Sequence, residues 1–242
     1  MSGHSKWATT KRQKAKVDAA RGKVFSKVAR ELMVAAREGG PNPDANFRLK
    51  IVVDKAKSVN MPAENIKRAI ERATGGGDSA AFEEVIYEGY GPAGVAVLLE
   101  VMTDNRNRTA AEIRHIFDRN GGSLGATGCV AWMFKRKGQV ILNVEDVKQS
   151  EDDLMMLALD AGAEDFSREE DQYVVLTAPE GLEKVRGNLI KQGLKVADAE
   201  LTYIPTTSTE LGGDKAEQAM RLLELLEDHD DVQGVHANLD VK

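Results

Sequence analysis

Residues 16–40 read KVDAARGKVFSKVARELMVAAREGG, and this stretch decides how the first third of the chain folds. At about 100° per residue, its apolar side chains fall on one arc and its cations on an arc nearly opposite, the pattern of an amphipathic helix. The glycines and proline that follow end this helix. The apolar arc holds Val17, Val24, Val28, Leu32 and Ala35, and the basic arc holds Lys16, Lys23, Lys27, Arg30 and Arg37.

Two shorter helical segments follow. Pro43 stands at a first helical position with Asn42 before it as the N-cap, so a helix is expected from there to about Ser58. Pro62 begins a third helix, which the glycines at 75–77 end. Its apolar side carries Ile66, Ala69, Ile70 and Ala73. Three short helices with apolar inner faces predict a small bundle.

Charge is distributed unevenly along the chain. Residues 1–75 hold seventeen lysines and arginines and seven acidic residues, a net charge of +10, whereas residues 76–242 hold sixteen and thirty-two, a net charge of −16. A local excess of positive charge attracts a polyanion through release of its counterions, and the acidic remainder repels the same polymer. We expect nucleic acid to dock at the amino-terminal end while the other domains are held away.

From about Phe82 the pattern changes to alternating strands and helices. Strands are expected at 84–88, 95–102 and 129–135, with a helix that starts at a capping box of Thr109 and Glu112 and ends at Gly121. Then come a strand at 139–144, a helix at 152–160, strands at 164–167 and 173–177, a helix at 179–191 and a strand at 195–204. This β-α-β-β-α-β order is the ferredoxin-like pattern.

A last helix around 216–226 and a last strand at 232–241 have no partners in this count. The strand-helix-strand unit before Lys135 lacks a matching helix and strand, so the ferredoxin-like domain is expected to be inserted into a domain that the carboxyl-terminal elements complete. The predicted fold is α+β, with an N-terminal three-helix bundle and two α/β domains. The predicted domains are a basic helical bundle at 1–78, a discontinuous α/β domain at 79–134 and 206–242, and an inserted ferredoxin-like βαββαβ domain at 135–205.

The amino-terminal run mixes cations with one aromatic residue: Lys6, Trp7, Lys11, Arg12, Lys14 and Lys16. Lysine and arginine bind phosphates, and an indole can stack on an unpaired base. The alternative is a solvated tail with Trp7 packed on the bundle. Binding is favoured because the cations recur on the helical face described above.

Two further segments have a binding and a structural interpretation. The short connection at 58–61 would suit a helix-turn-helix with Asn65, Lys67, Arg68 and Arg72 on the reading helix, or an ordinary αα-hairpin. The segment TDNRNRT at 103–109 places Arg106 and Arg108 at a strand-to-helix junction. These arginines could bind phosphate, or Asp104 could form an ion pair with one of them in a network that caps the start of the helix.

Catalysis finds little support. The glycine-rich stretch at 121–128 lacks the ending of a phosphate loop. The histidines His4, His115, His229 and His236 have no metal-ligand spacing, and a divalent-ion site at 228–231 has no supporting pattern. Cys129 is expected to be a buried structural thiol. We therefore expect no enzymatic activity, no catalytic residue, no metal, no cofactor and no small-molecule substrate.

The cellular compartment follows from cysteine content and hydropathy. One cysteine permits no intrachain disulfide, which fits a reducing cytoplasm. The amino terminus is charged and has no apolar core of a secretory signal, although an Arg-rich start also allows a mitochondrial presequence as a weaker alternative. The longest apolar runs are strand-sized, so no membrane partner is expected.

Several motifs together resemble the YebC/PmpR family over nearly the whole chain. They are GHSKW at 3–7, RGKVF at 21–25, NMP at 60–62, YEGYGP at 87–92, TDNRNRT at 103–109, VAWMF at 130–134 and LEDHDDVQ at 226–233. Ala93 stands where the family commonly has a second glycine, and Cys129 where a serine is usual.

The resemblance implies a three-domain protein and a cytoplasmic, DNA-binding transcriptional regulator without enzymatic activity. For some members it implies instead a ribosome-associated translation factor that binds ribosomal RNA and relieves stalls at proline-rich sequences. The partner is therefore expected to be DNA or ribosomal RNA, with the ribosome as a further candidate. The predicted nucleic-acid-binding residues are Lys6, Trp7, Lys11, Arg12, Lys14, Lys16, Arg21, Lys23, Lys27 and Arg30, with Arg106 and Arg108 as a secondary contact.

Overall fold

The computed structural model describes residues 21–75 and 82–242. Within these residues one compact unit is formed by Phe134–Thr206, and the other by the residues on either side of it in the chain. The predicted insertion of one α/β domain into another is therefore confirmed, while the boundaries of the three domains stay a prediction. No helix in the described ranges has both the length and the apolarity to cross a membrane.

The first three described helices form the predicted bundle: α2 (Arg21–Gly39), α3 (Phe47–Ser58) and α4 (Ala63–Thr74). Leu32, Leu49 and Ile66 meet in its core. The second helix begins four residues later than the sequence predicted, because Asn46 rather than Asn42 caps it. The Asn46 side chain accepts from the amide of Leu49 and donates to the carbonyl oxygens of Ala35 and Gly40.

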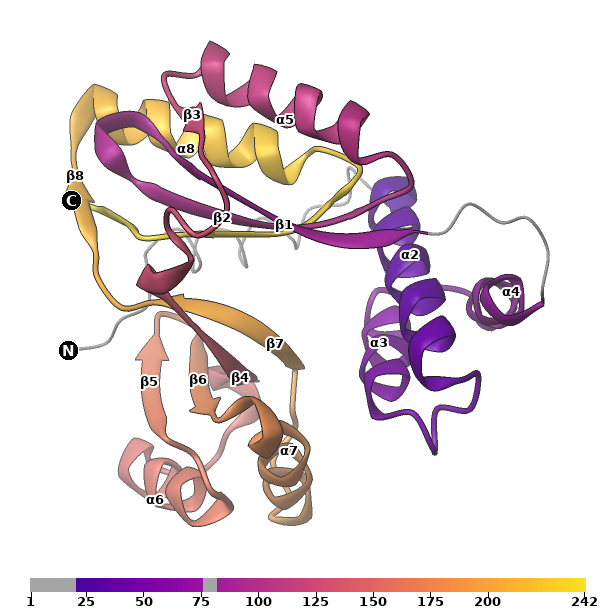
Figure 1. Cartoon of the computed structure of the whole chain (residues 1–242). Helices are drawn as coiled ribbons and strands as arrows, with labels where there is room; N and C mark the ends of the chain where they lie inside the picture. Colours follow the sequence, from indigo (N-terminus) through magenta and orange to yellow (C-terminus); the bar gives the residue numbers. More distant parts are fainter. Residues whose placement is uncertain (1–20, 76–81) are drawn as a thin grey trace. The chain divides into compact units, whose positions relative to one another are not determined.

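The larger α/β domain is discontinuous in sequence. Before the insertion it contains β1 (Glu83–Tyr90), β2 (Ala96–Thr103), α5 (Arg106–Arg119) and β3 (Ser123–Leu124). After the insertion come β8 (Thr209–Leu211), α8 (Gly213–Glu227), β9 (Val232–Ala237) and β10 (Leu239–Val241). The sheet order is β3-β1-β2-β9, and β8 and β10 form a separate parallel pair. Figure 1 shows α5 and α8 side by side on one face of the sheet, where Phe117 and Leu222 enter the core.

Strand β9 completes this sheet, as predicted, but the single strand predicted at 232–241 is divided, and β10 pairs with β8 instead. Strand β9 pairs antiparallel with β2, with Leu99 opposite Val235. Just beyond β9, the buried side chain of Asn238 accepts a hydrogen bond from the amide of Ala96 at 2.8 Å. Backbone and side-chain hydrogen bonds thus join β2, from before the insertion, to β9 and Asn238, from after it.

The inserted unit contains β4 (Phe134–Asn143), α6 (Glu151–Ala161), β5 (Asp165–Glu169), β6 (Gln172–Thr177), α7 (Leu182–Lys191) and β7 (Asp198–Pro205). Its strands are ordered β5-β6-β4-β7 and all neighbours are antiparallel, which is the ferredoxin-like arrangement. The helices α6 and α7 lie next to each other beside this sheet (Figure 1). Leu142, Leu154 and Leu189 are fully buried and form part of its core.

The separate strand predicted at 129–135 is wrong: residues 129–133 are not in a strand, and 134–135 are the start of β4, which continues into the strand predicted at 139–144. Residues Ala131–Met133 form a single 3₁₀ turn, and β4 begins at Phe134. The cause is Glu88, whose buried carboxylate accepts hydrogen bonds from the amides of Gly128, Val130 and Ala131 at 2.6, 2.8 and 2.7 Å. Backbone donors that a strand would offer to a neighbouring strand are bound by this side chain instead.

Candidate nucleic-acid interface

Lys23, Lys27 and Arg30 of the predicted basic stripe lie on α2, while Lys16 lies outside the described residues. Lys23, Lys27 and Arg30 follow one another at spacings of four and three residues, which places them on one face of the helix. All three contact residues 227–231, which join α8 to β9. We call this stretch, with the sequence EDHDD, the acidic segment.

The two lysines of the stripe bind different groups of the acidic segment. The Nζ atom of Lys23 lies 2.8 Å from Oδ1 of Asp228, and this hydrogen bond and the Asp228 charge raise the pKa of Lys23 above its ordinary value. The Nζ atom of Lys27 donates to the carbonyl oxygen of Glu227 at 2.6 Å. Because Glu227 is the last residue of α8, Lys27 satisfies a carbonyl at the negative end of that helix.

Arg30 is less accessible than Lys23, with 19% of its side chain exposed against 47%. It donates to the carbonyl oxygen of Asp230, and its Nη1 atom lies 3.4 Å from Oδ1 of Asp231. Its guanidinium also lies 5.4 Å from the ring centroid of Phe82, within the range of a cation–π contact. The stripe therefore contacts carboxylates and backbone carbonyls of the same chain.

Asp231 is the anchor of the acidic segment. It is 4% exposed, and its carboxylate accepts from Oγ1 of Thr109 at 2.7 Å and from Nη2 of Arg108 at 2.9 Å. Burial disfavours the charged form of Asp231, but these hydrogen bonds and the charges of Arg30 and Arg108 outweigh it. The pKa of Asp231 is consequently below its ordinary value, and the residue is an anion at neutral pH.

The start of α5 is a cap network rather than an open arginine pair. Its N-cap is Asn105, which accepts from the amide of Arg108, so the capping box expected at Thr109 is wrong. Arg108 also binds Asp104 at 2.9 Å, the pairing that the sequence left open, and Arg106 lies 3.5 Å from Glu83. Thr109 is fully buried, and its hydroxyl donates a hydrogen bond to the Asp231 carboxylate.

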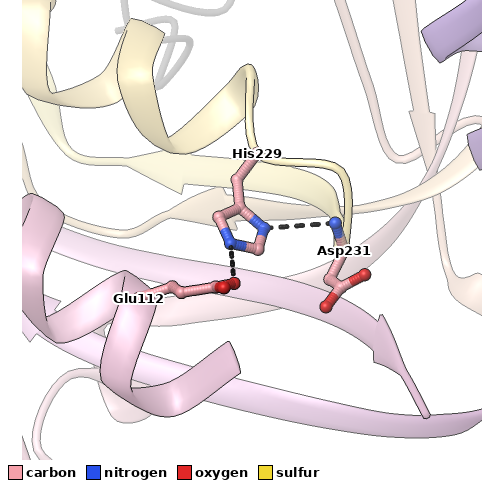
Figure 2. A group of neighbouring side chains, drawn as sticks. All are labelled: Glu112, His229 and Asp231. Carbon is pink, nitrogen blue, oxygen red and sulfur yellow. Dashed lines mark hydrogen bonds and ion pairs between the residues drawn. The ribbon is translucent and has the colours of Figure 1, made fainter. Parts of the chain in front are cut away.

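One group of side chains has the composition of a metal site. Ligand atoms of Glu112, His229 and Asp231 lie within 4.8 Å of one another (Figure 2). Nδ1 of His229 accepts from the amide of Asp231 at 3.1 Å, so Nε2 carries the ring proton and faces Glu112 Oε2 at 2.9 Å. The Asp231 carboxylate is bound by Thr109 and Arg108. Each potential ligand already serves a hydrogen bond, so the group suits a structural network better than a cation.

The outer face of α4 is the second basic surface of the bundle. Asn65, Lys67, Arg68 and Arg72 are all exposed. Lys67 lies 3.8 Å from Glu71 and Arg68 lies 3.8 Å from Glu64, each one helical turn away. Exposed pairs of this kind contribute little to stability, so they leave these cations available for exchange. The helix-turn-helix interpretation stays a prediction.

The remaining predicted site residues differ in what the structure describes. Arg21 is the first residue of α2. The run of Lys6, Trp7, Lys11, Arg12, Lys14 and Lys16 lies outside the described residues. Sequence reasoning missed Asp231 and Glu88 as organising residues. Glu88 had a detectable signal, since it is a carboxylate within a strand flanked by apolar and glycine positions, whereas Asp231 looked like one more surface acid.

Comparisons with known proteins agree over the full length. Residues 5–76 match the model of the TACO1/YebC protein N-terminal domain, and residues 82–239 match that of the TACO1/YebC second and third domain. A probable transcriptional regulatory protein of Pelotomaculum thermopropionicum is 59% identical over 242 residues, covering 100% of both chains. Another, from Desulfitobacterium hafniense, is 55% identical over 241 residues and covers 99% of this chain and 96% of its own.

A solved structure is similar as well. The crystal structure of a conserved hypothetical protein from Aquifex aeolicus superposes with a TM-score of 0.88 at 47% identity, covering 94% of this chain and 93% of the other. The same arrangement of helices and sheets is therefore found in a related chain. By these matches over both parts of its sequence, the protein belongs to the TACO1/YebC family, which is the YebC/PmpR family that its motifs resemble.

Proposed function

We propose that this protein is a non-enzymatic regulator of gene expression that binds nucleic acid through its amino-terminal bundle, in a reducing cytoplasm. The observation that carries the proposal is the α2 stripe, where Lys23, Lys27 and Arg30 together bind an acidic segment. A face that binds carboxylates and carbonyls with three convergent cations has the donors that a phosphate backbone requires. The names of the relatives as probable transcriptional regulatory proteins support the same proposal.

The proposed contacts follow the charge. The cations of the amino-terminal run at 6–16, Arg21 and the α2 stripe supply the phosphate contacts, with Trp7 available for stacking on a base. Arg106 and Arg108 form a secondary contact. Arg106 suits this role better, because 60% of its side chain is exposed and its ion pair with Glu83 is long.

A second candidate function is a translation factor that binds ribosomal RNA and relieves stalls at proline-rich sequences. The observation that favours it is the α4 surface, where Arg68 lies beside Glu64 at the start of the helix that would read DNA bases. A carboxylate at that position repels phosphate. A lysine stripe without a reading helix suits structured RNA at least as well as promoter DNA.

Competition binding separates the two candidates. A promoter-specific regulator prefers its operator over random duplex by roughly a thousandfold or more, at a stated salt concentration. A ribosome-associated factor shows no such preference and co-sediments with ribosomes. Failure to bind duplex DNA, structured RNA and ribosomes would contradict the proposed function altogether. A substrate screen that found turnover abolished by Cys129→Ala or His115→Ala would contradict its non-enzymatic part.

A further inference from the structure

We infer that the acidic segment is a built-in competitor of nucleic acid, which occupies the phosphate-binding face of α2 and must leave that face when nucleic acid binds. The inference rests on the proposed function. Its basis is that the same three cations expected to contact phosphate are those that hold residues 227–231. A phosphate polymer and the acidic segment cannot occupy this face together.

The competitor is shaped independently of α2. The carbonyl oxygen of Asp231 accepts from the amide of Met102 at 2.8 Å, which fixes the end of the segment to β2. Thr109 and Arg108 hold its carboxylate, and the His229 ring accepts from the Asp231 amide. These partners all belong to the α/β domain, so the segment keeps its conformation when α2 separates from it. The state in which the acidic segment covers α2 and the state in which it has left α2 then differ only in the contacts between the segment and α2.

The contacts with α2 are of the kind that a polyanion can displace. Lys27 donates to the backbone carbonyl of Glu227, a neutral acceptor. Arg30 donates to the backbone carbonyl of Asp230 and also lies 3.4 Å from the Asp231 carboxylate. The ion pair of Lys23 with Asp228 is exposed, with 47% and 67% of the two side chains accessible. Each backbone phosphate carries a full negative charge and makes stronger hydrogen bonds than a neutral carbonyl, and each phosphate contact also releases a condensed counterion. Single small anions gain no such release and compete poorly.

The test neutralises the exposed acids and spares the anchor. In Asp228→Asn/Asp230→Asn the charges that attract Lys23 are removed, while Asp231 and its partners remain. The matched control, Asp118→Asn/Glu217→Gln, removes the same charge at exposed positions of α5 and α8. Both variants and the wild-type protein are titrated with a structured RNA hairpin and with mixed-sequence duplex DNA, at about 50 and 200 mM salt.

The segment variant is expected to bind nucleic acid roughly three- to tenfold more tightly than the control at low salt, since it loses one exposed ion pair and a neighbouring charge. The difference shrinks at high salt because exposed pairs are screened. In the Lys23→Ala/Lys27→Ala/Arg30→Ala background the gain disappears, because the face that the segment covers is gone. Equal affinity of segment variant and control in the wild-type background would overturn the inference.

A second measurement does not depend on nucleic acid. An amine-reactive reagent modifies exposed lysines, and mass spectrometry follows its reaction with Lys23 relative to exposed Lys67. The relative rate reports whether the acidic segment covers α2. It is expected to rise in the segment variant and not in the control. Faster labelling of Lys23 with unchanged nucleic-acid affinity would show a structural contact only and overturn the inference alone. If no protein in the set bound RNA or DNA, the proposed function and the inference would both fail.

Discussion

Nη2 of Arg108 lies 2.9 Å from Oδ2 of Asp231, and this ion pair joins the start of α5 to the start of β9. The two residues are 123 positions apart in sequence. Arg108 is exposed enough to meet a ligand, yet one of its donors holds the buried acid that shapes the acidic segment. Arg108, one of the two arginines of the proposed secondary contact for nucleic acid, thus also holds Asp231, the anchor of the acidic segment.

The pair makes stability depend on Asp231. Asp231→Asn is expected to lower the free energy of unfolding by about 1–3 kcal/mol at neutral pH, the range for hydrogen bonds to a buried charged group. Because the pKa of Asp231 is lowered in the folded state, this stabilisation is present above about pH 4, near the unfolded pKa. It disappears as pH falls through the lower folded pKa. Urea unfolding of wild type and variant at neutral and acidic pH measures whether their unfolding free energies converge as pH falls.

The exposed acid Asp118 supplies the control for this prediction, because Asp118→Asn should change stability by less than about 0.5 kcal/mol. A constant difference between wild type and Asp231→Asn from neutral pH to about pH 3 would contradict the assignment of a lowered pKa to Asp231.

Glu88 organises the loop that precedes the insertion. In Glu88→Gln one oxygen becomes an NH₂ group, which cannot accept a hydrogen bond. If the remaining oxygen stays on the amides of Val130 and Ala131, the amide of Gly128 loses its acceptor and faces another donor. A decrease in unfolding free energy of about 1–3 kcal/mol is expected from the donors left without a partner. Trp132, which is 70% exposed, should also change its fluorescence as the loop loosens. The exposed Glu83→Gln is the control, and equal unfolding midpoints for the two variants would argue against this role of Glu88.

The group of Glu112, His229 and Asp231 is expected to bind no divalent cation firmly. Its histidine presents a protonated nitrogen to Glu112, and its aspartate is held by Arg108. Addition of Zn²⁺ or Mg²⁺ should therefore leave the unfolding temperature of the wild-type protein unchanged, as should a chelator. A rise in that temperature that His229→Ala abolished would show a metal site here.

Local patterns in the sequence predicted most of the fold. The ferredoxin-like order emerged because each of its strands and helices carries its own periodicity and turn residues. The insertion was predicted because one strand-helix-strand unit had no partner, and β9 supplies it through its pairing with β2. The strand expected at 129–135 failed because Glu88, forty residues away, binds the backbone amides. A distant side chain overrode a local preference.

The candidate site was predictable only in part, for the same reason. The helical spacing of Lys23, Lys27 and Arg30 is visible in the sequence, and the structure places them on one face. That residues about 200 positions later would cover this face is a tertiary contact with no local signature. The net charge of residues 1–75 indicated attraction to a polyanion, and in the structure the chain's own acidic segment contacts these cations.

The salt dependence of nucleic-acid binding tests the central claim that α2 is a phosphate-binding face. The logarithm of the affinity for structured RNA is measured against the logarithm of salt concentration for wild type and for Lys23→Ala/Lys27→Ala/Arg30→Ala. The slope of the variant is expected to be flatter by about 0.7–0.9 for each phosphate that the variant no longer binds, with similar weakening for every sequence tested. An unchanged slope in a variant with a native circular dichroism spectrum would contradict the account.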